Sequence, residues 1–298
     1  MLNYSHHKHH RLSLFDGVNE LFLLLVSLLC VYPFLYVFFV ACSDGASLAL
    51  GQVTFLPKGF QLLSFQYIFD NPRFNVGTGL INSFLYTLGG TAVALFVTYI
   101  TAFVLSRKRF VHRHWIMRLF IITWVFDAGI IPQYIIYNAF SFVDNPLVMI
   151  IPGAINTQFL IIARTFLLGI PDELEEAAFI DGASDLQILF RVFLPLSTTI
   201  LATVGTFYAV SIWNQYLIPQ IYLKSDKYRT IQQVLKNVVV TDGASDTTFV
   251  NVTVGDVTLN QHNLKAAAIF VTMLPIVLVY PFVQKYFKKG VLLGSVKG

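Results

Sequence analysis

Six long apolar stretches, at 21–41, 80–105, 119–140, 146–163, 192–223 and 266–284, constrain this chain more than any other feature, because together they hold a single charged residue, Asp127. A helix needs about 20 apolar residues to cross the hydrocarbon core of a bilayer. Inside a bilayer the backbone must satisfy its own hydrogen bonds, which a helix does. The sequence therefore predicts an all-α, polytopic membrane protein with six transmembrane helices, over about residues 19–41, 79–105, 117–139, 146–168, 196–222 and 264–284.

The composition supports the same class of protein. Only 12% of the 298 residues are charged and 56% are hydrophobic, whereas soluble domains carry about 25% charged residues. Much of the surface therefore has to face lipid. The first apolar stretch is too long for a signal peptide and lacks a clean small-residue cleavage site after it, so we expect it to remain as the first helix.

Lysine and arginine predict the orientation, since cytoplasmic loops of membrane proteins carry an excess of both. With the N-terminus inside, 13 of the 20 fall on the cytoplasmic side, including the run at 107–109, so the net charge of +4 needs no nucleic-acid partner. Two outer segments, 43–78 and 224–262, are long; within the second, an amphipathic run at 228–240 predicts a helix and the polar stretch at 241–263 predicts a loop. We therefore predict a cytoplasmic tail at 1–17, a six-helix domain at 18–284 with a cytoplasmic loop at 169–195, and a cytoplasmic tail at 285–298.

The loop at 169–195, called the motif segment below, carries clear local signals. Pro171 suits the first turn of a helix, acidic residues follow it, and Gly182 favours a stop, which predicts a helix over 171–181. Ser184 followed three residues later by Gln187 is a capping-box pattern that starts a second helix, and Pro195 interrupts the chain before the fifth span. Geometry alone leaves two interpretations open: a plain surface helix, or a thin helix that lies in a groove of a partner protein.

The motif segment resembles the signature of the inner-membrane subunits of bacterial ABC importers. Glu176-Ala177-Ala178 is followed by three residues, Gly182, nine residues, Val192, one residue and Leu194-Pro195. Val192 stands where the family pattern has isoleucine, and it keeps the β-branched apolar character. The resemblance implies a type I importer permease fold in which this segment is the coupling helix that docks on the ATPase. It assigns that coupling to Glu175, Glu176, Ala177, Ala178, Asp181, Gly182, Ala183, Leu194 and Pro195.

Weaker likenesses elsewhere point to the carbohydrate branch of these permeases, close to the complex-polysaccharide and alginate-type subgroup. They lie at residues 82–108, 129–134, 213–216 and 289–298. The chain has no G-x-x-x-x-G-K-[ST] phosphate loop, so ATP and Mg²⁺ are expected on a partner ATPase and no cofactor on this chain. The resemblance further implies a second, different permease subunit, an extracytoplasmic solute-binding protein and an oligosaccharide substrate.

Polar side chains within the apolar stretches are candidates for the transport path, since they usually face a cavity or a neighbouring helix. For Asp127 two interpretations stay open: a structural role, as a pair with a neighbouring helix or a protonated hydrogen-bond donor, or a pore-lining group that orients sugar hydroxyls. The other candidates combine amides and aromatics, which suit sugars but also join spanning helices and sit at membrane interfaces. They are Trp124, Gln133, Tyr134, Asn138, Asn156, Gln158, Trp213, Asn214, Gln215 and Tyr216.

Three other classes compete with an oligosaccharide importer. An intramembrane enzyme would need a nucleophile–base pair or metal ligands at membrane depth, but no histidine lies within any predicted span. An ion-coupled secondary transporter would show inverted repeats and several intramembrane charges, whereas this chain has one charge in its apolar stretches and no visible repeat. An ABC importer permease for a non-sugar solute fits the same motif. The histidines at 6–10 are expected to belong to a flexible tail, and no metal site is predicted.

Overall fold

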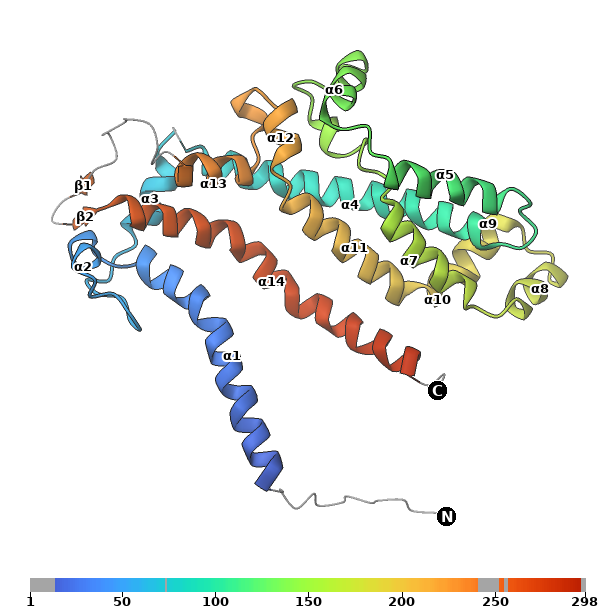
Figure 1. Cartoon of the computed structure of the whole chain (residues 1–298), viewed down its shortest axis with the longest axis horizontal. Helices are drawn as coiled ribbons and strands as arrows, with labels where there is room; N and C mark the ends of the chain where they lie inside the picture. Colours follow the sequence, from blue (N-terminus) through green and yellow to red (C-terminus); the bar gives the residue numbers. More distant parts are fainter. Residues whose placement is uncertain (1–13, 73, 241–251, 255–256, 296–298) are drawn as a thin grey trace. The chain divides into compact units, whose positions relative to one another are not determined.

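The computed structural model describes residues 14–72, 74–240, 252–254 and 257–295 (Figure 1). The chain forms two compact units, Met1–Tyr67 with Asp246–Phe270 and Ile68–Ser245 with Val271–Gly298. The described elements are α1 (Leu14–Ala41), α2 (Gly45–Ala49), α3 (Leu63–Asp70), α4 (Val76–Ser106), α5 (Arg113–Val125), α6 (Ile130–Ala139), η1 (Pro146–Met149), α7 (Thr157–Leu168), α8 (Glu173–Ile180), α9 (Asp185–Gln187), η2 (Ile188–Phe193), α10 (Leu194–Leu196), α11 (Thr198–Trp213), α12 (Leu217–Tyr222), η3 (Asp226–Tyr228), α13 (Ile231–Val240), β1 (Val252–Val254), β2 (Val257–Leu259) and α14 (Gln261–Ser295).

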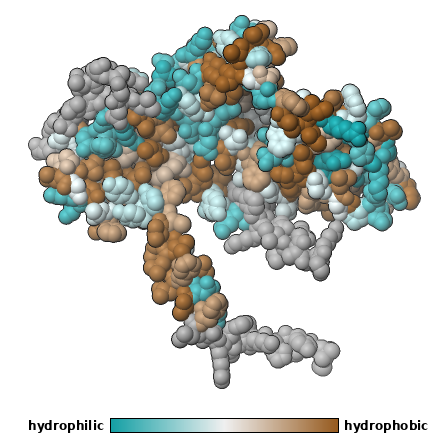
Figure 2. Space-filling model, viewed as in Figure 1, coloured by the Kyte–Doolittle hydropathy of each residue, from teal (hydrophilic) through white to brown (hydrophobic). Residues whose placement is uncertain are grey.

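Three helices in the described part of the chain are long and apolar enough to cross a membrane: Phe15–Ala41, Val76–Ser106 and Gln261–Pro281. Five candidate spans result if each of two bent helix pairs is one span. Helix α1 exposes apolar side chains along most of its length, and its surface is mostly brown in Figure 2. A surface of this kind suits lipid, so the helical membrane class is confirmed.

The predicted third span, 117–139, is not one continuous helix. It consists of α5 and α6, which meet at an angle of 115°. Asp127 lies in the break, where its Oδ1 accepts the N–H of Gly129 at 2.5 Å, and Gly129 takes a positive φ of 80°. A short polar side chain that bonds the nearby backbone and a glycine in that region both end a helix.

The predicted fourth and fifth spans also differ from unbroken helices. In 146–168 only Thr157–Leu168 is α-helical, after the 3-10 turn η1, because Pro152 and Gly153 interrupt the run. In 196–222 helix α11 ends at Trp213 and the shorter α12 follows. Apolar composition therefore marked these segments as helical but did not predict where the helices break.

The segment predicted as a loop at 241–263 contains an antiparallel pair of strands. Val252 pairs with Leu259 and Val254 with Val257. Both strands alternate apolar residues with threonine, a strand pattern that the polar composition of the whole segment concealed. The amphipathic run at 228–240 forms α13 as predicted, whereas α14 continues to Ser295, beyond the predicted end of the sixth span. The histidines at 6–10 lie outside the described residues.

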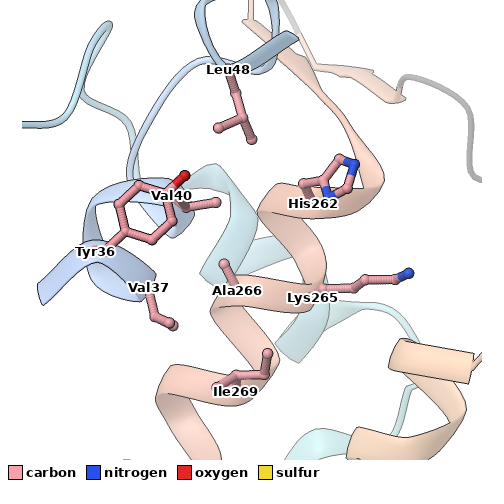
Figure 3. A pocket seen from close by; sticks show the side chains of 8 residues that line it. All are labelled: Tyr36, Val37, Val40, Leu48, His262, Lys265, Ala266 and Ile269. Carbon is pink, nitrogen blue, oxygen red and sulfur yellow. The ribbon is translucent and has the colours of Figure 1, made fainter. Parts of the chain in front are cut away.

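The first unit is held together by buried side-chain amides at the end of α1. Asn263 Nδ2 donates to the carbonyls of Val40 at 2.8 Å and Ser43 at 2.9 Å. Gln61 Nε2 donates to the Ser43 carbonyl at 2.9 Å as well. These bonds satisfy carbonyls that the end of a helix leaves without partners. A cavity of about 430 Å³ lies among α1, α2 and α14, lined in part by Tyr36 and His262 (Figure 3), and it contains none of the predicted site residues.

The second unit is built around α4. Helices α7 and α11 pack along α4 and run beside it in Figure 1. Their core holds Tyr99, Phe103, Leu160, Phe193 and other buried residues. Helix α13 covers the first turns of α4, where Gly79 allows a close approach of the two backbones. Helix α4 is therefore the element that most others of this unit contact.

Gly79→Val is expected to destabilise the protein by about 1–3 kcal/mol through overpacking. A Cβ at this position would lie 3.1 Å from Val234 Cγ2 and 3.3 Å from Ile231 Cα, which is backbone and cannot rotate away. Gly77→Val is the matched control, since nothing lies within 4 Å of a Cβ there. Thermal unfolding of the purified protein in detergent measures both. Equal loss of stability in the two variants would contradict the close approach.

Candidate functional site

The motif segment forms the compact helix α8, which ends in a Schellman motif. Its N-terminal turn carries Glu173, Glu175 and Glu176, whose negative charges are stabilised by the positive end of the helix dipole. At the other end Gly182 has φ +76°, its N–H donates to Phe179 O, and the Ala183 N–H donates to Ala178 O, each at 3.0 Å. A residue with positive φ is favourable only as glycine or asparagine, so the glycine of the motif has a defined backbone role.

The second half of the segment begins with the predicted capping box. The Ser184 side chain accepts the backbone N–H of Gln187, and Gln187 Oε1 accepts the backbone N–H of Ser184 at 2.8 Å. The following turn, η2, is π-helical and leads to Pro195, which has no N–H to donate. Phe193 is fully buried there. The capping box is therefore confirmed where the sequence predicted it, whereas the helical run continues through Pro195 and bends by 83° only after Leu196.

Arg107 anchors this segment from the end of α4. Its guanidinium donates to Glu175 Oε2 and to the Leu167 carbonyl, both at 2.9 Å, and its Cζ lies 4.3 Å from the centroid of the Phe193 ring. The side chains of Arg107 and Glu175 are 5% and 15% exposed. An arginine fork can satisfy a carboxylate, a carbonyl and an aromatic face together. Arg107 thus joins α4, α7, α8 and η2 at one point.

Two further basic residues extend this contact at the surface. Lys108 pairs with Asp172, and Arg109 pairs with Asp185 while its Cζ lies 4.9 Å from the centroid of the Phe179 ring. The hydrogen bond between Lys108 and Asp172 lowers the pKa of Asp172 and raises the pKa of Lys108. Both groups therefore stay charged at neutral pH. Since these pairs are exposed, solvent screens them far more than the pair of Arg107.

The outward side of the motif segment is apolar although it faces solvent. Ile180 is 86% exposed and Leu186 67% exposed, and Leu174 is exposed as well. Ala177 and Glu176 are exposed beside them, whereas Ala178 packs on the core. An exposed apolar group on an ordered helix, rimmed by carboxylates, is typical of a protein–protein contact.

The coupling residues expected from the motif thus divide into two sets. Glu176, Ala177, Asp181, Gly182 and Pro195 are exposed. Those on the inner side are half-buried and pack on the core or bind Arg107; they are Glu175, Ala178, Ala183 and Leu194. Arg107, Lys108 and Arg109 were missed as site residues, although three consecutive basic residues before an acidic segment offered a signal.

A second candidate site is a cavity of about 200 Å³ inside the second unit. Asn156 and Gln215, two of the predicted path residues, line it together with Tyr137, Ser211 and Phe159. Asn156 also caps α7, because its Oδ1 accepts the N–H groups of Gln158 and Phe159. Tyr137 and Ser211 were not predicted. The cavity therefore combines polar groups with aromatic rings.

The structure brings some of the other path candidates together and separates the rest. Asp127 and Gln133 share a bond of 3.4 Å. Trp213 is buried and donates to the Thr272 carbonyl, and Tyr216 lies under Lys236. Tyr134 stacks on the Tyr222 ring. The remaining candidates, Trp124, Asn138, Gln158 and Asn214, are exposed.

These features define a class: a polytopic helical membrane protein that carries an ordered, acidic helix at its surface, anchored to a long spanning helix. Among the described residues no group of three or more His, Cys, Asp or Glu side chains is placed to hold a metal ion. The family described as "Binding-protein-dependent transport system inner membrane component" matches residues 14–293. The chain belongs to this family: it is a multi-pass inner-membrane permease subunit of an ABC importer, which works with a separate ATPase and a binding protein.

Individual relatives cover nearly the whole chain. Protein LplC of Bacillus subtilis (strain 168) is 38% identical over 95% of this chain and 95% of its own length. The polygalacturonan/rhamnogalacturonan transport system permease protein YtcP of the same organism is 36% identical over 96% and 99%. A crystal structure of a bacterial ABC transporter involved in the import of the acidic polysaccharide alginate matches with a TM-score of 0.81 and 28% identity, covering 96% of this chain and 100% of that chain.

Gly182→Ala is expected to weaken the end of α8 by about 1–2 kcal/mol, since an L-residue with a side chain resists a left-handed backbone. Gly182→Asn is the matched variant, and it should cost less because asparagine tolerates this conformation. Hydrogen exchange of the amides at positions 182 and 183 measures the effect, with exchange about 5- to 30-fold faster in the alanine variant. Equal protection in both variants would be inconsistent with a strain of backbone origin.

Proposed function

We propose that this chain is a permease subunit of an ATP-driven importer of oligosaccharides, and that the motif segment couples it to the ATPase. The observation that carries the proposal is the division of α8 into an exposed apolar side and an inner side fixed to Arg107. Two relatives named for polygalacturonan and alginate support a carbohydrate substrate. An arabinooligosaccharide permease among the other relatives points the same way, whereas three relatives are named for sn-glycerol-3-phosphate, a solute that is not an oligosaccharide.

The outward side of α8 is the proposed docking surface for the ATPase. Alanine at 177 keeps this helix thin, so a groove can approach its backbone closely. Ile180 and Leu186 supply apolar area that is now in contact with water, and Glu176 and Asp181 form a polar rim. Interfaces of proteins commonly have this arrangement of an apolar centre and a polar edge.

The proposed topology has six spans with both termini in the cytoplasm. The bent pair of α5 and α6 serves as the third span, and the segment from η1 to α7 serves as the fourth. Broken helices are tolerated at membrane depth where protein covers the freed backbone groups. The excess of lysine and arginine on the proposed inner side, including the residues that contact the motif segment, supports this orientation. The outer segments would then face the binding protein, and a second, different permease would complete the pathway.

The cavity lined by Gln215 is the proposed contact for part of the substrate. Its volume of about 200 Å³ is below the roughly 300–1,000 Å³ of pockets for drug-sized ligands, so it suits one sugar ring of a longer chain. The amide of Gln215 and the hydroxyls of Ser211 and Tyr137 can bind sugar hydroxyls, and Phe159 offers an apolar face. The other path candidates remain predictions.

Ala177→Leu is expected to weaken association with the ATPase by about 5- to 150-fold, because added volume in a close helix contact costs about 1–3 kcal/mol. Co-purification of the ATPase with the tagged permease from membranes provides the measurement. Ala139→Leu, at another exposed alanine at the end of α6, is the matched control. Full ATPase recovery with Ala177→Leu, at a normal amount of permease in the membrane, would refute the docking role.

Gln215→Ala and Ser211→Ala are each expected to lower substrate uptake about 2- to 10-fold, the effect of losing one hydrogen bond. Association with the ATPase should not change. Uptake of labelled oligosaccharide into proteoliposomes is the readout, and Gln220→Ala, an exposed glutamine outside the cavity, is the control. Uptake at the normal rate in both cavity variants would show that the substrate takes another route.

A further inference from the structure

We propose that Arg107 is a positioning residue that transmits the movement of the motif segment to α4, and that Lys108 and Arg109 are dispensable for this transmission. The inference rests on the proposed function, because it concerns how the proposed coupling segment is connected to the spanning helices. Arg107 itself would touch neither substrate nor ATPase.

The geometry distinguishes Arg107 from its two neighbours. All three bind an acidic residue of the motif segment, at Glu175, Asp172 and Asp185. The side chains of Arg107 and Glu175 are 5% and 15% exposed, whereas those of Lys108 and Asp172 are 74% and 47% exposed. A desolvated pair cannot exchange its partner for water without a large penalty, while an exposed pair can.

Arg107 also connects more elements than an ion pair requires. Besides Glu175 it binds the carbonyl of Leu167 at the end of α7 and Ser106 Oγ at 3.0 Å, and it lies over two aromatic rings. One of these rings, Phe103, belongs to α4 and the other, Phe193, belongs to η2. The planar guanidinium is therefore enclosed by the four elements that would have to separate if α8 moved independently.

A second contact joins the motif segment to α4 at a position farther from the C-terminal end of that helix. The Tyr99 hydroxyl donates to the carbonyl of Leu189 at 3.1 Å, and both residues are buried. Tyr99 and Arg107 are two turns apart on α4, so they attach η2 and α8 to the same helix. Two such contacts restrict rotation as well as separation, which is what transmission of a displacement requires.

The test uses the assembled transporter in proteoliposomes and compares four variants. Arg107→Lys keeps the charge but loses the fork and the ring contact, and Glu175→Gln removes the charge of the partner. Lys108→Gln and Arg109→Gln are the matched controls in the same run of residues. Each is assayed for ATPase association, for ATP hydrolysis stimulated by the substrate-loaded binding protein, and for uptake per ATP hydrolysed.

We expect uptake per ATP to fall about 2- to 30-fold in Arg107→Lys and Glu175→Gln, the range seen when coupling residues are altered. Their ATPase association should stay within about twofold of the parent, and both controls should couple normally. Three results would overturn the proposal: unchanged uptake per ATP in Arg107→Lys, equal losses in the controls, or loss of assembly in step with a fall in coupling. Failure of the unaltered transporter to bind the ATPase would instead refute the proposed function.

Discussion

The guanidinium of Arg107 is a charge buried where four elements of the second unit meet. Such a charge is stable only while it is paired and hydrogen-bonded, and leaving it without a partner costs about 3–5 kcal/mol. Glu175 and the Leu167 carbonyl supply those partners. Helices α4, α7 and α8 are consequently held together more firmly than the exposed pairs of Lys108 and Arg109 could hold them.

Sequence reasoning located the parts of this site that depend on near neighbours. The stop at Gly182 and the capping box from Ser184 to Gln187 each involve residues within a few positions, so a local pattern predicted them. The bond between Arg107 and Glu175 joins residues 68 positions apart. The basic run was interpreted only through the distribution of charge across the membrane, because no local pattern says which carboxylate a distant arginine will meet.

The spans show the same limit. Runs of apolar residues predicted where spans lie, and in agreement α1 and α4 are each long and apolar enough to cross a membrane. They did not predict the 115° break between α5 and α6, because that break depends on how Asp127 bonds the Gly129 N–H and on a positive φ at the glycine. The bond from the Gly129 N–H to Asp127 Oδ1 places Asp127 just before the start of α6, a local contact that neither interpretation of Asp127 included. That bond leaves its second carboxylate oxygen available to other groups.

Helix α8 has only eight residues, and its two sides carry different tasks. Ile180 and Ala177 face solvent, while Glu175 and Ala178 face the core. Both ends are fixed by hydrogen bonds, the Schellman motif at Gly182 and the bonds from the first turn to Asp172 O. So short a helix with fixed ends does not bend, and a push on its outer side has to move its inner side. That side is bonded to the end of α4, a helix of 31 residues and about 46 Å. In the proposed coupling, a displacement at the surface of the motif segment would therefore reach this helix.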